Sequence, residues 1–320
     1  PVPVACQLVQ AFQTIITRNK KPVDAGVISV TMINAGEATN VVPDFCVIQG
    51  TVRTFSIEVL DLIESRMRQI TDNLCAAFAQ VPHKSAAQEM FMSAASPGVV
   101  SLFFRNDHYK DHETYLYAIA EVMRHEYESV AKAGIVLQID CPDLAMGRHI
   151  QYADLPLPEF RKRAQMHVEA LNHALANIPA EQLRMHVCWG NYEGPHHCDV
   201  DFSSIIDIVF KAKPHAISFE AANPRHAHEW TLFESVKLPE GKVLIPGVLE
   251  SKTNFIEHPE LIAQRIARYA HLVGRENVIA GSDCGYGTWV GQAAVDPDVV
   301  WAKLAAMAEG ARIASKQFWK

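Results

Sequence analysis

The stretch Leu183-Arg184-Met185-His186-Val187-Cys188 is an apolar segment that ends on a histidine and a cysteine two positions apart. On a β-strand, this spacing directs both side chains to the same face. Two later apolar segments end in a similar way, residues 216–220 on Glu220 and residues 278–284 on Cys284. Because parallel strands of a barrel bring their carboxyl ends to one face, we expect these four side chains to converge there.

Two thiolates, an imidazole and a carboxylate form a complete tetrahedral ligand set for zinc. A zinc-bound thiolate stays nucleophilic near neutral pH, whereas a free thiol with a pKa of about 8.5 is mostly protonated. Glu220 could act as a labile ligand that yields to an incoming substrate thiol. The spacing alone leaves other interpretations open, because a buried cysteine is often a small core residue and a glutamate at a strand end often caps a helix.

Strand and helix patterns alternate from about residue 81 onward, which is typical of βα units with a parallel sheet. We predict an α/β fold of the (β/α)8 barrel type that lacks two strands, because about six units are present where closure needs eight. The predicted strands are 90–95 with 99–103, 135–140, 185–189, 216–220, 243–249 and 278–284. The predicted helices are 112–132, 158–177, 202–212, 258–273 and 298–317.

Residues 1–80 show a different pattern, a helix, a hairpin and a second helix that Ser56 caps. We therefore predict two domains, a small α+β module over 1–80 and the barrel over 81–320. A second metal site in the segment 195–199, which contains His196, His197 and Cys198, is a weaker alternative to a loop beside the first site.

The composition excludes several functional classes. The formal net charge is -7 and Lys/Arg clusters are absent, so neither nucleic acid nor an anionic membrane is an expected partner. No apolar run approaches the roughly 20 residues of a membrane span, and no signal-peptide pattern opens the sequence. The seven cysteines are scattered and odd in number, which favours reduced thiols and a cytoplasmic location. Nucleotide cofactors are not expected, because no phosphate-binding glycine motif appears.

Residues from about 88 to 319 resemble the cobalamin-independent methionine synthase superfamily in its C-terminal barrel. They are similar above all to the short members that include epoxyalkane:coenzyme M transferase. The resemblance rests on five motifs: Val136-Leu137-Gln138-Ile139-Asp140-Cys141-Pro142-Asp143, Met185-His186-Val187-Cys188-Trp189-Gly190-Asn191, Ser218-Phe219-Glu220-Ala221-Ala222-Asn223-Pro224-Arg225-His226, Ile245-Pro246-Gly247-Val248 and Gly281-Ser282-Asp283-Cys284-Gly285.

The resemblance implies that a substrate thiol held on Zn²⁺ is alkylated, most often methylated, as in methionine biosynthesis. The family's zinc ligands match four residues of this sequence: His186, Cys188, Glu220 and Cys284. Asp140 matches an aspartate that binds the substrate amino group, although it could also orient loop backbone. We predict Asp140 and Glu220 as catalytic. Lys252 stands near the position of the proton-donating histidine of methionine synthases, which weakens the case for folate as the methyl donor.

Three further residues complete the predicted substrate site. Arg225 is a candidate contact for a carboxylate or sulfonate. Trp189 and Tyr286 flank the ligand strands and are candidates for an apolar wall, although aromatic packing is the alternative. The expected small-molecule partners are a thiol acceptor and an alkyl donor.

Residues 33–44 and 50–55 resemble the lid, or dimerisation, domain of the M20 amidohydrolase family. The carriers are Ile33-Asn34-Ala35-Gly36-Glu37-Ala38-Thr39-Asn40-Val41-Val42-Pro43-Asp44 and Gly50-Thr51-Val52-Arg53-Thr54-Phe55. This resemblance implies a homodimer formed through residues 1–80. Two alternatives to a transferase remain open: an inactive fusion that dimerises and binds zinc, and an M20-type N-acyl amino acid hydrolase, which the missing di-metal motifs disfavour.

Overall fold

A computed structural model describes residues 2–21, 23–35, 46–80, 91–132, 134–287 and 295–319. Two compact units divide the chain, Pro1–Gln88 with Gly287–Ala293 and Glu89–Tyr286 with Ala294–Lys320. The predicted domain boundary near residue 80 adjoins residues 81–90, which lie outside the described part. Each unit is considered by itself below.

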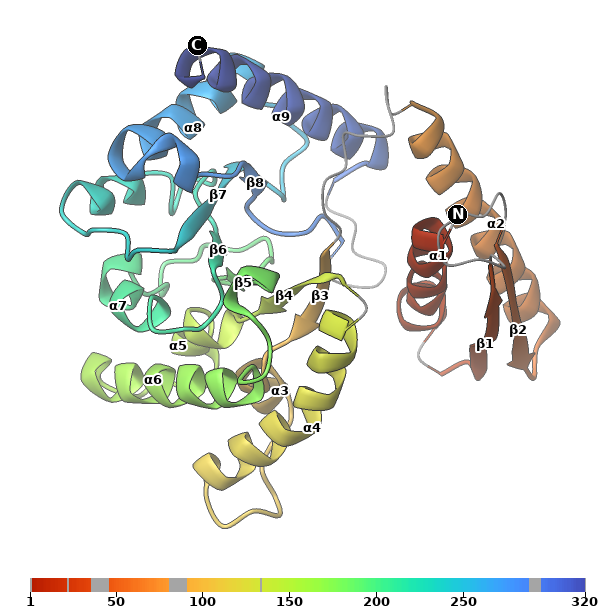
Figure 1. Ribbon diagram of the computed structural model, residues 1–320. Coiled ribbons are helices and arrows are strands. Elements are labelled where there is room, and N and C mark those ends of the chain that lie inside the picture. The colour runs from red at the N-terminus through yellow and green to blue at the C-terminus, as the bar shows by residue number, and fades with distance from the viewer. Residues whose placement is uncertain are drawn as a thin grey trace. The chain divides into compact units, whose positions relative to one another are not determined.

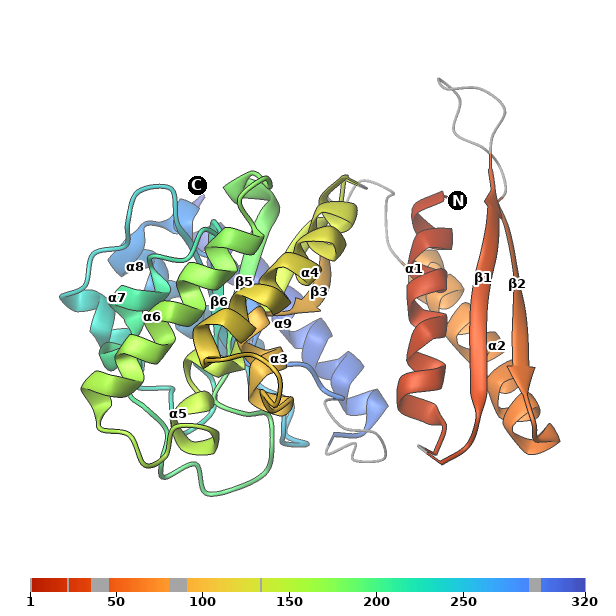
Figure 2. The same cartoon turned by 90° about the horizontal axis from the view of Figure 1, so that it is seen from below.

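The first unit has the helix–hairpin–helix order that the sequence predicts. Helix α1 (Val2–Thr14) continues into a five-residue π-helix (Ile15–Asn19), and α2 spans Ile57–Gln80. Strands β1 (Gly26–Asn34) and β2 (Val47–Thr54) pair antiparallel, and both helices pack against this hairpin (Figure 2). The core of the unit consists of Phe12, Ile15, Ile28, Val59 and Ile63. The Ser56 hydroxyl accepts a hydrogen bond from the Val59 amide, as predicted for a helix cap.

The second unit is built on six parallel strands that form a half-barrel, ordered β3-β4-β5-β6-β7-β8 as in the sequence. Their bounds are Phe91–Ala95, Val136–Asp140, Leu183–Val187, Ala216–Phe219, Val243–Leu249 and Gly281–Ser282. An α/β barrel that lacks two strands was predicted, and within the described residues this fold class is confirmed. β8 is much shorter than the predicted strand 278–284, although Val278 also forms a parallel bridge to Leu244 on β7.

Helices lie around the outer face of the curved sheet (Figure 1). The long ones are α4 (His112–Lys132), α6 (Leu157–Ala174), α8 (Pro259–Val273) and α9 (Pro297–Phe318). The short ones are α3 (Pro97–Phe103), η2 (Pro142–Leu144), α5 (Gly147–Ile150), η3 (Ala180–Gln182), η4 (Phe202–Ser204), α7 (Ile206–Val209), η5 (Glu229–Glu234) and η6 (Arg275–Asn277). Between helices and sheet, Leu137, Met185, Ile217 and Leu244 are fully buried.

Two predicted elements were wrong in detail. Residues 99–103 were predicted as a strand but belong to α3, because the Ser96 hydroxyl caps the Val99 amide at 2.9 Å and Pro97 stands in the first helical turn. The single helix predicted over 202–212 is a 3₁₀ turn followed by the one-turn helix α7. An apolar run is ambiguous between strand and helix when the cap is not recognised.

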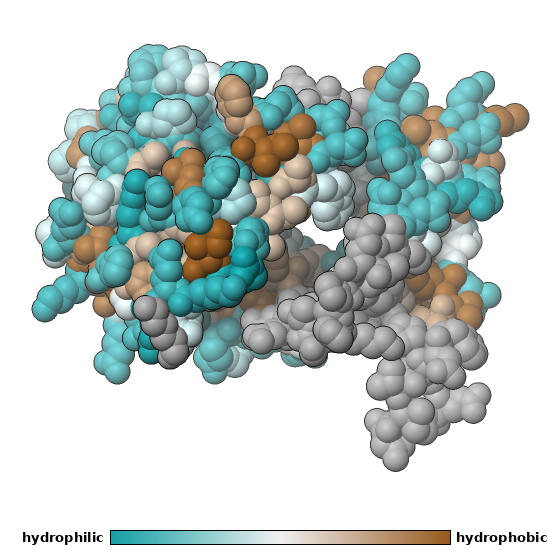
Figure 3. Space-filling model, turned by 90° about the horizontal axis from the view of Figure 1, so that it is seen from above, coloured by the Kyte–Doolittle hydropathy of each residue, from teal (hydrophilic) through white to brown (hydrophobic). Residues whose placement is uncertain are grey.

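On the face shown in Figure 3, exposed apolar side chains form small patches among hydrophilic ones. Scattered exposed apolar residues are normal on protein surfaces. Among the described helices, none is both long and apolar enough to cross a membrane.

Candidate metal centre

Three buried side chains meet at the carboxyl end of the sheet. His186 lies on β5, Cys188 follows that strand directly, and Cys284 follows β8. Their ligand atoms all lie within 4.8 Å of one another, and the two sulfur atoms are 3.5 Å apart. A histidine nitrogen and two sulfurs at this separation can bind one metal ion, and zinc is the ion that such a donor set suits best.

Glu220 follows β6 and extends towards the same group. Its Oε1 atom lies 3.6 Å from the Cys284 sulfur and accepts a 2.8 Å hydrogen bond from the Trp189 amide. Its Oε2 atom accepts a bond of 2.8 Å from the Asn223 side chain and lies 4.0 Å from the Lys252 ammonium. Burial, followed by repulsion from Asp283, raises the pKa of Glu220. A cation beside this carboxylate would offset both effects.

The two thiols differ in acidity. The contact between the two sulfur atoms lowers the pKa of Cys188, and the same contact, together with burial, raises the pKa of Cys284. The Gly190 amide also donates to the Cys188 sulfur at 3.2 Å. Cys188 is therefore the more acidic thiol of the pair.

Asp283 fixes the loops that carry Glu220 and Cys284. Its Oδ1 atom accepts the amides of Ala221 and Ala222, both at 2.8 Å, and its Oδ2 atom accepts the Asn223 amide at 2.8 Å. This carboxylate is fully buried. Sequence reasoning missed its role, although Asp283 stands next to Cys284 in a motif that was recognised.

Gly247 on β7 makes room for this carboxylate. A Cβ atom at Gly247 would lie 1.9 Å from Asp283 Oδ1 and 2.7 Å from the Asp283 Cα atom. No side chain fits there without moving the Asp283 loop, since real Cβ atoms do not approach other atoms so closely.

A second polar network holds the loop after β5. Asp199 accepts from His196 Nδ1 at 3.1 Å and from His226 Nε2 at 3.0 Å, and Glu229 bonds His226 Nδ1 at 2.9 Å. Burial alone would lower the pKa of His226, but these two carboxylates outweigh it and raise the pKa to about 9. His196 and Asp199, from the segment considered as a second metal site, are thus engaged with each other.

The predicted substrate residues have different surroundings. Trp189 is fully buried, contacts the tilted His226 ring with 4.2 Å between ring centroids and donates a hydrogen bond to the Val200 carbonyl. Its ring therefore offers no surface to a substrate in this conformation. Arg225 is exposed. Tyr286 is half-buried two residues after Cys284, and among the described residues its hydroxyl has no hydrogen-bond partner.

Asp140 ends β4 and lies opposite His186 in the β4–β5 register. Burial, followed by repulsion from Asp143, raises the pKa of Asp140 to about 7. Its Oδ1 atom has no hydrogen-bond partner within the described residues. Of the M20-like motif 33–44, residues 36–44 lie outside the described part.

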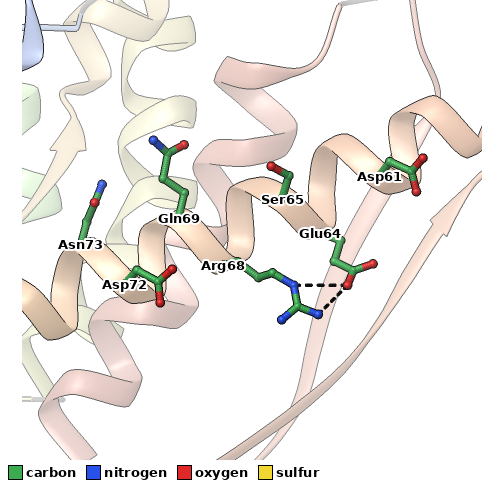
Figure 4. A pocket seen from close by; sticks show the side chains of 7 residues that line it. All are labelled: Asp61, Glu64, Ser65, Arg68, Gln69, Asp72 and Asn73. Carbon is green, nitrogen blue, oxygen red and sulfur yellow. Dashed lines mark hydrogen bonds and ion pairs between the residues drawn. The ribbon is translucent and has the colours of Figure 1, made fainter.

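A shallow hollow along α2 is lined by neither histidine nor cysteine (Figure 4). All seven side chains that line it are exposed: Asp61, Glu64, Ser65, Arg68, Gln69, Asp72 and Asn73. Arg68 and Glu64 form an i,i+4 ion pair at 2.7 Å, which is common on a solvated helix face.

Comparisons with known proteins cover most of the chain. Residues 65–311 match the family described as "Cobalamin-independent synthase, Catalytic domain". A solved structure of a B12-independent methionine synthase from Shewanella sp. W3-18-1, in complex with selenomethionine, superposes with a TM-score of 0.57 over 91% of this chain and 76% of that chain. At 19% sequence identity, this likeness concerns the fold.

Curated relatives match a smaller part. N-acetyl-L-cysteine deacetylase of Bacillus subtilis (strain 168) is 43% identical over 79 residues, which are 25% of this chain and 19% of that protein. N-acetyldiaminopimelate deacetylase of Leuconostoc mesenteroides subsp. mesenteroides is 35% identical over 77 residues, 24% of this chain and 20% of that protein. The chain thus spans about a fifth of the length of these relatives, and the predicted partial resemblance to M20 deacetylases is confirmed.

Proposed function

Because this chain belongs to the family of cobalamin-independent synthase catalytic domains, we propose that it is a zinc-dependent transferase that alkylates a substrate thiol. Methyl is the first candidate for the transferred group, and methionine biosynthesis is the corresponding process. The observation that carries this proposal is the buried triad of His186, Cys188 and Cys284 at the carboxyl end of the half-barrel. Barrel enzymes assemble their active sites at that face.

In this proposal Glu220 is the fourth ligand of the zinc. Bound zinc would supply a thiolate at neutral pH by lowering the pKa of the substrate thiol. Glu220 is held by the Trp189 amide and the Asn223 side chain, with Lys252 close to its Oε2 atom. Because these groups can hydrogen-bond or ion-pair with the carboxylate, it can leave a metal without becoming an unpaired buried charge. Glu220 would then give its place to the substrate sulfur.

Asp140 is our candidate for binding a substrate amino group. A buried carboxylate oxygen without a partner can receive an ammonium, and ion pairing would lower the raised pKa of Asp140. The Tyr286 hydroxyl is a second unpaired polar group near Cys284, and we propose that it contacts the substrate as well. Arg225, which is exposed, is proposed to attract an anionic substrate group.

Other parts of the proposal concern the whole chain. We propose a cytoplasmic enzyme with a functional division at about residue 80, and a homodimer formed through residues 1–80. Apolar side chains on the exposed hairpin, among them Val27, Met32, Ile33 and Val47, support an interface there, because such residues are suited to pairing with a second hairpin.

The test is X-ray absorption spectroscopy at the zinc edge, with and without added thiol. The protein alone is expected to give two sulfur ligands, and homocysteine or coenzyme M is expected to add a third. The thiol that adds a sulfur ligand identifies the chemical class of the acceptor. A zinc signal without sulfur ligands would contradict the proposal. If zinc is bound but neither thiol changes the number of its sulfur ligands, the result would favour an inactive zinc-binding fusion.

A further inference from the structure

A second group of potential metal ligands contains no cysteine and comes from two helices and the segment after a third. His112 is the first residue of α4, His167 lies on α6, and Tyr152 follows α5. The Nε2 atoms of the two histidines are 3.0 Å apart. The Tyr152 hydroxyl oxygen lies 3.1 Å from His112 Nε2 and 3.3 Å from His167 Nε2. Three donor atoms from three separate segments thus form a small triangle.

A buried carboxylate orients His167 within this triangle. Asp143 Oδ2 lies 2.9 Å from His167 Nδ1, and Asp143 Oδ1 accepts the Ser96 hydroxyl at 2.6 Å. The proton of His167 therefore resides on Nδ1, and the Nε2 lone pair points towards His112 and Tyr152. Metal-binding histidines typically donate their other ring nitrogen to a carboxylate in this manner.

Gly98 in α3 keeps space for the carboxylate–histidine pair. A Cβ atom at this position would lie 1.9 Å from Asp143 Oδ2 and 2.7 Å from His167 Nδ1. The backbone of α3 is therefore packed directly against the pair, which fixes the direction of the His167 lone pair.

The triangle lacks hydrogens. Three contacts among three atoms require three hydrogens, and neutral groups supply at most two, one from Tyr152 and one from His112 Nε2. One of the three contacts therefore has no hydrogen of its own, whereas a cation bound between the three atoms would use a lone pair of each.

We propose that His112 Nε2, His167 Nε2 and the Tyr152 oxygen bind a divalent metal ion of the zinc type, with water as the fourth ligand. Ligands about 2.0–2.1 Å from a tetrahedral zinc are separated by roughly 3.3 Å, close to the three distances here. Tyr152 loses its proton to solvent when the metal binds, and the phenolate and the Asp143 carboxylate together balance two positive charges. Arg163 also acts on His112 and Tyr152, and it opposes the cation while favouring the phenolate.

This site would join α4, α6 and the segment after α5 without using any cysteine. It is independent of the transferase proposal, because none of its ligands belongs to the His186–Cys188–Cys284 triad. A metal bound only by the folded state raises the free energy of unfolding in proportion to the logarithm of its concentration.

The experiment starts from a Cys188→Ser/Cys284→Ser variant, which removes the sulfur ligands. After dialysis against Zn²⁺, this variant is expected to retain about one zinc per chain. With Co²⁺ it is expected to show visible ligand-field bands without sulfur charge transfer. Adding His112→Ala or Tyr152→Phe is expected to abolish this binding and the zinc-dependent rise in Tm. His173→Ala, on the same helix as His167, is the matched control and is expected to retain the metal.

If the double cysteine variant is poorly folded, the same His112→Ala and Tyr152→Phe changes are made in the unaltered chain. The metal content is then expected to fall by about one ion per chain while the sulfur charge transfer with Co²⁺ persists. Unchanged metal content in both variants overturns the proposal. Retention of the metal by His112→Ala in the Cys188→Ser/Cys284→Ser background overturns it equally.

Discussion

The sulfur atoms of Cys188 and Cys284 lie 3.5 Å apart although 96 positions separate the two residues in the chain. Cys188 follows β5 and Cys284 follows β8, so that β6 and β7 lie between their strands in the sheet. On a flat sheet, strands three places apart would be separated by about 14 Å. The curvature of the half-barrel therefore brings the two sulfur atoms together, and Glu220, which follows the intervening β6, lies with its Oε1 atom 3.6 Å from the Cys284 sulfur.

Replacing Cys284 with serine is expected to weaken zinc binding at the triad by about 100-fold or more. Such losses follow even from changes in the groups that merely orient metal ligands. The measurement is competition with a chromophoric chelator. Cys198→Ser is the matched control, because Cys198 is exposed and outside the triad, and it is expected to bind zinc as the unaltered chain does. Equal affinities of the two variants would contradict the assignment of Cys284.

Gly247→Ala is expected to disturb the metal centre without touching a ligand. The added Cβ would displace the Asp283 carboxylate, which organises the backbone after Glu220. We expect a loss of about 2–4 kcal/mol in the free energy of unfolding, from overpacking and unsatisfied amides, together with weaker zinc binding. Urea denaturation and zinc competition measure the two effects. Gly285→Ala meets open space and serves as the control; similar losses in both variants would contradict the role of Gly247.

Much of this fold could be predicted because the strands are buried between layers. β7 is a continuous apolar run and β6 is interrupted only by Ser218, which is how strands of a covered parallel sheet appear in a sequence. The segment 99–103 was misread since Ser96 had not been identified as a cap. Local hydrogen bonds from one hydroxyl decided between strand and helix there.

The candidate metal site could be predicted where its residues follow directly after strands. His186, Cys188 and Cys284 were predicted from their positions after apolar runs, and the fold brings them together. The Asp283 network was not predicted, because three backbone amides from another loop leave no trace in a sequence pattern. Trp189 was read as a candidate pocket residue, and its full burial depends on packing that spacing does not reveal.

The stability of the chain is expected to fall as pH rises from about 6.5 to about 9 because of His226. Its pKa in the folded state is raised to about 9, so the protonated form contributes fully below the unfolded-state pKa of about 6.5 and is lost as pH passes 9. The shift corresponds to about 3 kcal/mol at most. Urea denaturation between pH 6 and pH 9.5 measures it.

His226→Gln is expected to remove this pH dependence. Lys242, whose pKa burial lowers to about 8, titrates in the same range, and therefore only the difference between the two proteins at each pH is informative. If the difference in the free energy of unfolding between the two proteins is the same from pH 6 to pH 9.5, Asp199 and Glu229 do not hold His226 in its charged form.

Asp140→Asn is expected to separate stability from substrate binding. Burial raises the pKa of Asp140 to about 7, so its carboxyl destabilises the folded chain increasingly as pH rises from about 4, and this cost is fully present above 7. The neutral asparagine is therefore expected to gain about 2 kcal/mol at pH 8. Binding of a substrate ammonium needs the carboxylate, so in the unaltered chain binding of homocysteine is expected to strengthen as pH rises through 7. Calorimetric titration at pH 6 and pH 8 checks this, and tight pH-independent binding by the variant would contradict it.

Lys303 on α9 is expected to support the loop that carries Lys252. Its ammonium is fully buried, pairs with Glu257 Oε2 at 2.8 Å and donates to the Glu250 carbonyl at 3.1 Å. Glu257 Oε1 in turn accepts the Glu250 amide at 2.8 Å. Lys303→Met leaves Glu257 as an unpaired buried charge, so we expect a loss of about 3 kcal/mol in urea denaturation.

Converting Glu257 to leucine in the same chain is expected to restore part of this loss, because no buried charge then remains. Lys162→Met is the matched control: Lys162 also pairs with a glutamate, but both side chains are largely exposed, so little change is expected. If the zinc affinity of Lys303→Met also falls, the loop positions Lys252 beside Glu220, 4.0 Å from its Oε2 atom. An unchanged zinc affinity would confine Lys303 to a structural role.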